Sequence, residues 1–122
     1  IGYDEKLAKK IYAGSDMFLI PSEFEPCGLG QLISLKYGTV PLATKTGGLA
    51  DSIIDIDHNY EKGNGYLAPN ASEYLNTFKR ALHCYHNDKI KWIQAQRNGM
   101  FADFSWHKSA KEYKKLYEKL LS

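Results

Sequence analysis

One ten-residue stretch, residues 22–31 (SEFEPCGLGQ), constrains the fold of this chain more than any other. It follows an apolar run at 17–21 (MFLIP) that has the length of a buried strand, and it leads into a helical pattern over 28–37. A strand, a glycine-containing loop and a helix start predict a ligand site at the carboxyl end of the strand. Unpaired amides and the dipole of the helix start favour a phosphate or sugar hydroxyls there.

Apolar runs and helical patterns alternate along the rest of the chain. The runs predict strands at 16–20, 40–43 and 65–68. This alternation predicts an α/β fold with a short parallel sheet flanked by helices, equal to half of a doubly wound domain. The polar residues 55–63 are expected to form an exposed loop.

Capping residues and apolar spacing predict the remaining helices. These are a helix capped by Asp4 that ends near Gly14, a short helix at 49–54, a helix opened by Asn70 and Glu73 with Tyr74, Leu75, Phe78, Leu82 and Tyr85 on one face, a helix at 88–100, and a last helix capped by Ser105. Trp92 and Trp106 lie on apolar faces and are expected in the core.

Length and composition allow one domain of 122 residues, and the net charge of +2 gives no sign of nucleic-acid or membrane binding. Cys27 and Cys84 are expected to be free thiols in a cytoplasmic protein. His83, Cys84 and His86 share one helix turn, which is too little for a closed metal site, so neither a metal nor a cofactor is expected. The chain begins at Ile1 rather than methionine, and we expect it to be a piece of a longer protein.

Sequence motifs occur in a familiar order along the chain: residues 25–31 (EPCGLGQ), 37–41 (YGTVP), 46–51 (TGGLAD) and 103–106 (DFSW). In order and spacing they resemble those of ADP-glucose-dependent bacterial glycogen synthases and plant starch synthases. The resemblance implies a C-terminal fragment of the catalytic region of those enzymes. It also implies a three-layer Rossmann-like half-domain, part of the C-terminal domain of a GT-B glycosyltransferase.

The same resemblance implies a division of the chain and a reaction. Residues 1–122 would be a fragment of the nucleotide-sugar-binding domain, with the donor site in a strand/helix core at 1–69 and C-terminal helices at 70–122. The reaction would be that of a retaining hexosyltransferase, which moves glucose from ADP-glucose to the non-reducing end of an α-1,4-glucan. The family's N-terminal domain is missing here, so we expect the chain alone to be inactive and its last helix to lack a partner.

Glu25 is the residue to which the resemblance assigns a catalytic role, in contact with the glucose of the donor. Pro26 holds the preceding backbone extended, just ahead of the helix. A carboxylate fixed there can accept hydrogen bonds from sugar hydroxyls and stabilise positive charge on the anomeric carbon. The simpler alternative is a carboxylate that only suits the helix dipole.

Binding of the donor is assigned by the resemblance to further residues: Tyr3, Cys27, Gly28, Leu29, Gly30, Thr46, Gly47 and Gly48. Tyr3 would stack on adenine, and Gly28 lets the backbone approach a ligand. Relatives usually carry threonine where this chain has Gly30, so one phosphate contact would be missing or replaced. Alternatively, Tyr3 is a surface residue and the turn at 46–48 is purely structural.

Other functions remain open on the sequence alone. The departure at Gly30 allows UDP-glucose or another nucleotide sugar as the donor, and a non-catalytic nucleotide- or glucan-binding module is also possible. Ser34 stands where many related transferases have a second glutamate, as expected for the glycogen and starch synthase branch. A receiver domain is disfavoured because the first strand ends in Pro21-Ser22 rather than a phospho-accepting aspartate. No obvious base or cation lies near Cys27 in the sequence, so it is not expected to be a nucleophile.

Overall fold

The computed structural model of this chain describes residues 2 and 4–121, and a parallel three-stranded sheet lies at its centre. The strands are β1 (Met17–Ile20), β2 (Val40–Thr44) and β3 (Tyr66–Ala68), in the order β1–β2–β3. Every residue of the central strand β2 is buried, as expected for a parallel strand covered on both faces. The predicted short parallel sheet is therefore confirmed.

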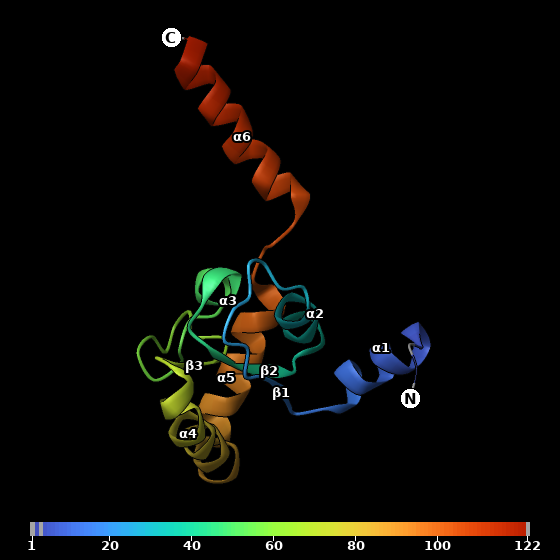
Figure 1. The fold of residues 1–122 in the computed structure, drawn as a ribbon, viewed down its shortest axis with the longest axis vertical. Coiled ribbons are helices and arrows are strands. Elements are labelled where there is room, and N and C mark those ends of the chain that lie inside the picture. Colours follow the sequence, from blue (N-terminus) through green and yellow to red (C-terminus); the bar gives the residue numbers. More distant parts are fainter. Residues whose placement is uncertain (1, 3, 122) are drawn as a thin grey trace.

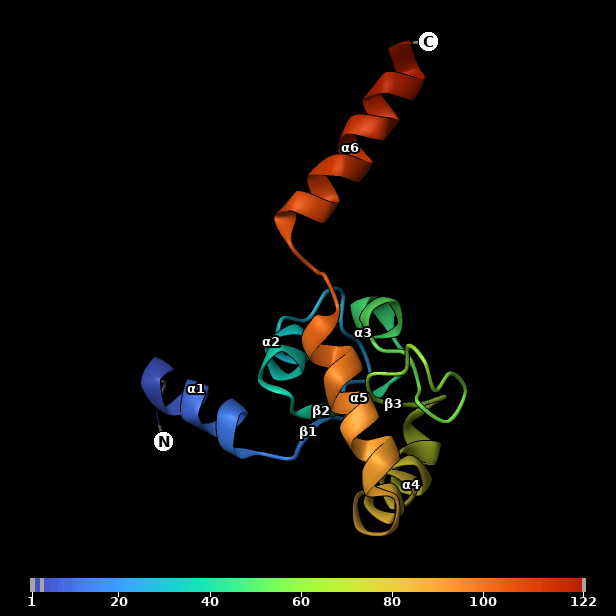
Figure 2. The same cartoon turned by 180° about the vertical axis from the view of Figure 1, so that it is seen from behind.

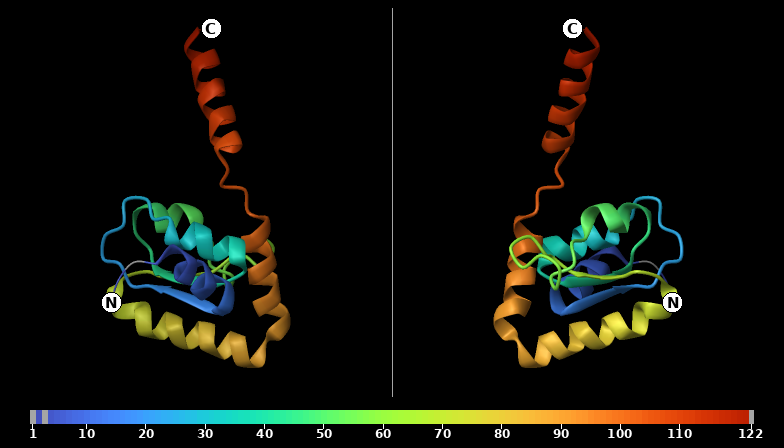
Figure 3. Two further views of the ribbon diagram at one scale, coloured as in Figure 1. Left: turned by 90° about the vertical axis from the view of Figure 1, so that its right-hand side faces the viewer. Right: turned by 90° about the vertical axis from the view of Figure 1, so that its left-hand side faces the viewer.

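Helices on both faces of this sheet give the predicted three layers. The helical elements are α1 (Glu5–Gly14), α2 (Gly30–Tyr37), α3 (Gly47–Ser52), a 3₁₀ turn η1 (Ala71–Glu73), α4 (Tyr74–Asn87), α5 (Lys89–Phe101) and α6 (Trp106–Leu121). Helices α2 and α3 lie on one face of the sheet, α4 lies on the other, and α5 stands across one end (Figure 3). The α/β class predicted from the sequence is correct.

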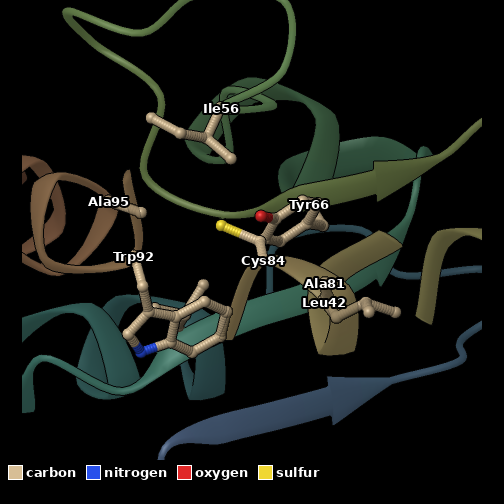
Figure 4. Close-up of a cluster of buried hydrophobic side chains, with 8 residues drawn as sticks. Leu42, Ile56, Tyr66, Ala81, Cys84, Trp92 and Ala95 are labelled. Atoms are coloured by element: carbon tan, nitrogen blue, oxygen red, sulfur yellow. The ribbon is translucent and has the colours of Figure 1, made fainter. Parts of the chain in front are cut away.

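The larger part of the core lies between the sheet, α4 and α5 (Figure 4). Leu42 and Tyr66 from neighbouring strands pack with Ala81, Cys84 and Trp92 from the two helices. Trp92 is only 3% exposed, which confirms its predicted place in the core. A smaller cluster from β2 and α3 fills the opposite face.

The predicted apolar face of α4 is confirmed in part. Tyr74, Phe78 and Tyr85 pack against the core, whereas Leu75 and Leu82 are 60% and 38% exposed. The buried positions are instead Thr77, Ala81 and Cys84. These side chains are small and let the helix lie close to the sheet, so the larger leucines are left at the sides of the contact.

Helix α6 projects away from the rest of the molecule (Figures 1 and 2). None of its described residues is buried, so the prediction that Trp106 belongs to the core is wrong: its side chain is 85% exposed. Apolar spacing shows that a helix has a face to cover, but not that the covering surface lies in the same chain. No described helix is both long and apolar enough to cross a bilayer.

The segment 55–63 is not the fully exposed loop that its polar composition predicts. Asp55 and Ile56 are 5% and 1% exposed, and Asp55 forms an isolated parallel bridge with Gly65. The Asp55 carboxylate also pairs with the guanidinium of Arg80 on α4, at 2.9 Å. A partner 25 residues away makes burial of this charge possible.

Candidate functional site

Two loops meet at the carboxyl ends of β1 and β2, as the sequence predicts for neighbouring parallel strands (Figure 3). The Gly48 N–H donates to the Glu25 carbonyl at 3.2 Å. A Cβ added to Gly47 would overlap the same carbonyl oxygen, and one added to Gly48 would overlap that of Cys27. Backbone therefore lies directly on backbone here, and only glycine fits at both positions.

The loop before α2 is longer than predicted, because the helix begins at Gly30 and not at Gly28. Gly28 has a φ of 73°, in the left-handed region, and Leu29 is the N-cap residue. The Gln31 side-chain amide donates to the carbonyls of Cys27 and Gly28, both at 3.0 Å, and this closes a turn ahead of the helix. The Gly28 and Leu29 amides thus come from a loop, followed by the free amides of the first helical turn.

Helix α3 starts earlier than predicted, and the expected tight turn at 46–48 is wrong. Thr46 is an extended N-cap residue, while Gly47 and Gly48 already belong to the helix. The Thr46 carbonyl accepts from the N–H groups of Leu49 at 3.1 Å and Ala50 at 3.3 Å. The close contact with the other loop explains why glycines can open this helix in spite of their poor helix propensity.

Glu25 lies at the junction of the two loops. Its backbone is fixed by the bond from Gly48, and the residue is half-buried, whereas Glu23 and Phe24 just before it are exposed. Glu25 is therefore carried by the loop that also supplies the Gly28 and Leu29 amides. Such an arrangement can hold an anion while a single acid faces the group attached to it.

The packing around position 30 explains why the residue there is glycine. A Cβ at this position would lie 2.8 Å from Cε1 of Phe18 on β1 and 3.4 Å from the Tyr12 hydroxyl. The Phe18 ring packs against Tyr12, with ring centroids 5.1 Å apart. Aromatic side chains thus fill the space that a larger residue would need, so the glycine is matched to its neighbours.

Sequence reasoning missed the buried polar residues that organise these loops. Gln31 is 1% exposed, and its amide also donates to Ser52 Oγ at 3.2 Å. Ser52, the last residue of α3, donates in turn to the Gly48 carbonyl at 2.6 Å. The only local signal was a glutamine four residues after Cys27, within reach of the turn before its own helix.

Two further predictions concern groups at or near the site. Tyr3, expected to stack on a base, lies outside the described residues. Cys27 is exposed and Cys84 is buried, and both are free thiols as predicted. Within residues 2 and 4–121, no group of three His, Cys, Asp or Glu side chains is arranged to hold a metal ion.

A parallel sheet whose strand-end loops present glycine amides and helix starts defines a Rossmann-like half-domain, and its carboxyl edge is where such domains bind ligands. No family model matches the chain. Individual relatives do. The chain is 50% identical to a glycogen synthase of Thermosipho melanesiensis, over 100% of its own length and 26% of the relative. It is 51% identical to a glycogen synthase of Bacillus cereus strain Q1, over 99% of its own length and 26% of the relative.

A solved structure gives the same answer for the fold. The catalytic domain of starch synthase IV from Arabidopsis thaliana, bound to ADP and acarbose, superposes with a TM-score of 0.87 at 44% identity. The match covers 98% of this chain and 25% of that one. The resemblance to glycogen and starch synthases is thereby confirmed, and the chain corresponds to about a quarter of such an enzyme.

Proposed function

We propose that this chain is the donor-binding part of an ADP-glucose-dependent α-1,4-glucan synthase. The enzyme would be a retaining hexosyltransferase of the GT-B arrangement, located in the cytoplasm, that adds glucose to the non-reducing end of a glucan. The donor site would lie in residues 1–69, and the helices of 70–122 would complete the domain.

One observation carries this proposal: the starch synthase with the same fold at 44% identity was bound to ADP and acarbose. A donor site would hold a nucleoside diphosphate, and an acceptor site would hold an oligosaccharide. The bond from the Gly48 N–H to the Glu25 carbonyl supports the same conclusion, because it brings the loop of Glu25, Gly28 and Leu29 against the start of α3 at one edge of the sheet.

Each residue of the site would have a role that follows from its chemistry. The amides of Cys27, Gly28, Leu29 and Gly30 would hold the diphosphate, because unpaired N–H groups at a helix start favour anions. Thr46, Gly47 and Gly48 would form the floor under the sugar. Glu25 would accept hydrogen bonds from the glucose hydroxyls and stabilise positive charge on the anomeric carbon. Tyr3 would stack on the base.

Binding of ADP by this chain is the first test, and UDP is the matched comparison. At ADP concentrations about ten times Kd, we expect the melting temperature to rise by about 5 °C. UDP at the same concentration is expected to give less than half of that shift. Equal shifts would favour a UDP-sugar donor or a base-tolerant site, and no shift with either nucleotide at millimolar concentration would contradict the proposal.

Replacement of Glu25 tests catalysis in a complete enzyme. In a chimaera where this segment replaces the matching quarter of the Thermosipho melanesiensis enzyme, Glu25→Ala is expected to lower kcat for glucan synthesis by about 10²- to 10³-fold. Exposed Glu23 lies two residues earlier, and Glu23→Ala is the control, with an expected change of less than about twofold. Equal turnover of both variants, with intact folding, would leave Glu25 without a catalytic role.

A further inference from the structure

Buried Gln31 connects the two loops of the candidate site through side-chain hydrogen bonds. Its Nε2 faces the carbonyl oxygens of Cys27 and Gly28 and the hydroxyl of Ser52, at 3.0, 3.0 and 3.2 Å. Carbonyl oxygens only accept hydrogen bonds, so the glutamine must present its NH₂ group to them. The Ser52 hydroxyl donates its own hydrogen bond to the Gly48 carbonyl at 2.6 Å.

These bonds fix the direction of the loop amides. In a trans peptide the C=O and N–H groups point in opposite directions. Gln31 draws the Cys27 and Gly28 carbonyls towards the buried side, so the N–H groups of Gly28 and Leu29 point away from it. Neither N–H donates to another backbone group within residues 2 and 4–121. A left-handed residue followed by a right-handed one, as at Gly28 and Leu29, forms a concave pair of N–H groups suited to anions.

We propose that Gln31 and Ser52 are positioning residues that orient the loop amides towards a bound nucleoside diphosphate. Gln31 holds the Cys27 and Gly28 carbonyl oxygens on the buried side, so that amides rather than carbonyls face the phosphates. Ser52 accepts a hydrogen bond from Gln31 and thereby ties this side chain to α3. This inference rests on the proposed function. It adds a specific role for a glutamine and a serine that touch the loops and not the ligand.

Substitutions at both positions test the role by their effect on ADP affinity. Gln31→Glu places a carboxylate against two carbonyl oxygens, and we expect ADP to bind at least about tenfold more weakly. Ser52→Ala removes the acceptor for Gln31 and the bond to the Gly48 carbonyl, and it is expected to weaken binding by about 3- to 10-fold. Ser52→Thr keeps the hydroxyl and is expected to restore most of the affinity.

Thr39→Val is the matched control. Thr39 is 1% exposed at the opposite end of β2, and its hydroxyl contacts the carbonyls of Tyr12 and Ser15. The control therefore loses bonds of the same kind without touching the site loops. We expect it to lower the melting temperature while leaving the Kd for ADP within about twofold.

The NMR chemical shifts of the loop amides distinguish a change in the site from a loss of stability alone. In the unsubstituted chain, ADP should shift the Gly28 and Leu29 amide resonances, and in Ser52→Ala these shifts should shrink while others remain. If the unsubstituted chain binds ADP but Ser52→Ala and Gln31→Glu behave like Thr39→Val, the positioning role is wrong and the proposed function stands. Absence of ADP binding by the unsubstituted chain overturns both. If Gln31→Glu does not fold, Ser52→Ala decides.

Discussion

Replacing Gly48 with alanine is expected to lower the free energy of unfolding by about 3 kcal/mol and to abolish measurable ADP binding. The added Cβ would overlap the Cys27 carbonyl, and the bond from the Gly48 N–H to the Glu25 carbonyl would break as the loops separate. Local propensity points the other way, because alanine is better than glycine in a helix by about 1 kcal/mol. The overlap is with backbone, which cannot turn aside, so the clash should outweigh the gain.

Gly14→Ala is the control for this result. Gly14 is the last residue of α1, its φ is not positive, and an added Cβ would meet nothing within 4 Å. We expect this variant to gain up to about 1 kcal/mol from propensity alone and to bind ADP unchanged. Urea unfolding and an ADP titration on both variants measure the difference. A stabilised Gly48→Ala variant would show that the two loops do not touch as described.

Sequence patterns were sufficient for the fold wherever the deciding forces were local. Apolar runs located all three strands, and the capping side chains of Asp4 and Asn70 accept the predicted backbone bonds from Leu7 and Glu73. The meeting of the two strand-end loops also followed from parallel topology alone. Apolar periodicity and parallel connection thus predicted that these two loops would meet at one edge of the sheet, and they do.

Errors arose where the partner of a side chain, rather than its apolar or polar character, decides its place. The Gln31 side chain donates hydrogen bonds to the carbonyls of Cys27 and Gly28, which form a turn. Helix α2 therefore begins at Gly30, two residues later than in the predicted helix 28–37. The amphipathic pattern of its helix predicts Trp106 in the core, yet none of the described residues of that helix is buried. Periodicity reports which side of a helix is apolar, but the surface opposite it is a property of the tertiary fold.

Asp55 has a structural role that the neighbouring sequence does not predict. Its carboxylate accepts bonds from the N–H groups of Leu67 and Asp57, both at 3.0 Å, as well as from Arg80. It thereby joins the 55–63 segment to β3 and α4. Asp57 in turn pairs with Arg80 and Lys91, so a network of charges lies where the sequence predicted an exposed loop.

Replacing Arg80 with methionine is expected to destabilise the fold by about 2–3 kcal/mol at pH 7. The Asp55 side chain is 4% exposed and would lose its counter-charge, which costs about 3–5 kcal/mol in a fully buried pair. The Arg80 side chain is itself 37% exposed, so solvent screens part of its interaction with Asp55. The expected loss of stability is therefore about 2–3 kcal/mol, below the value for a fully buried pair. Lys9→Met is the control, because the Lys9–Glu5 pair is exposed on both sides and should contribute less than about 0.5 kcal/mol.

The pH dependence of this difference identifies the charge as its cause. Burial raises the pKa of the Asp55 carboxyl, but hydrogen bonds from Arg80, Leu67 and Asp57 outweigh burial and hold the pKa below its ordinary value of 3.8. A lowered pKa stabilises the fold above pH 3.8, and this contribution disappears as the pH falls through the folded-state pKa. Without Arg80 the pKa of Asp55 rises, so the stability gap between the two proteins should narrow as the pH is lowered from 7 towards 3. Urea midpoints across that range measure the gap, and a constant gap would mean that Arg80 acts through packing alone.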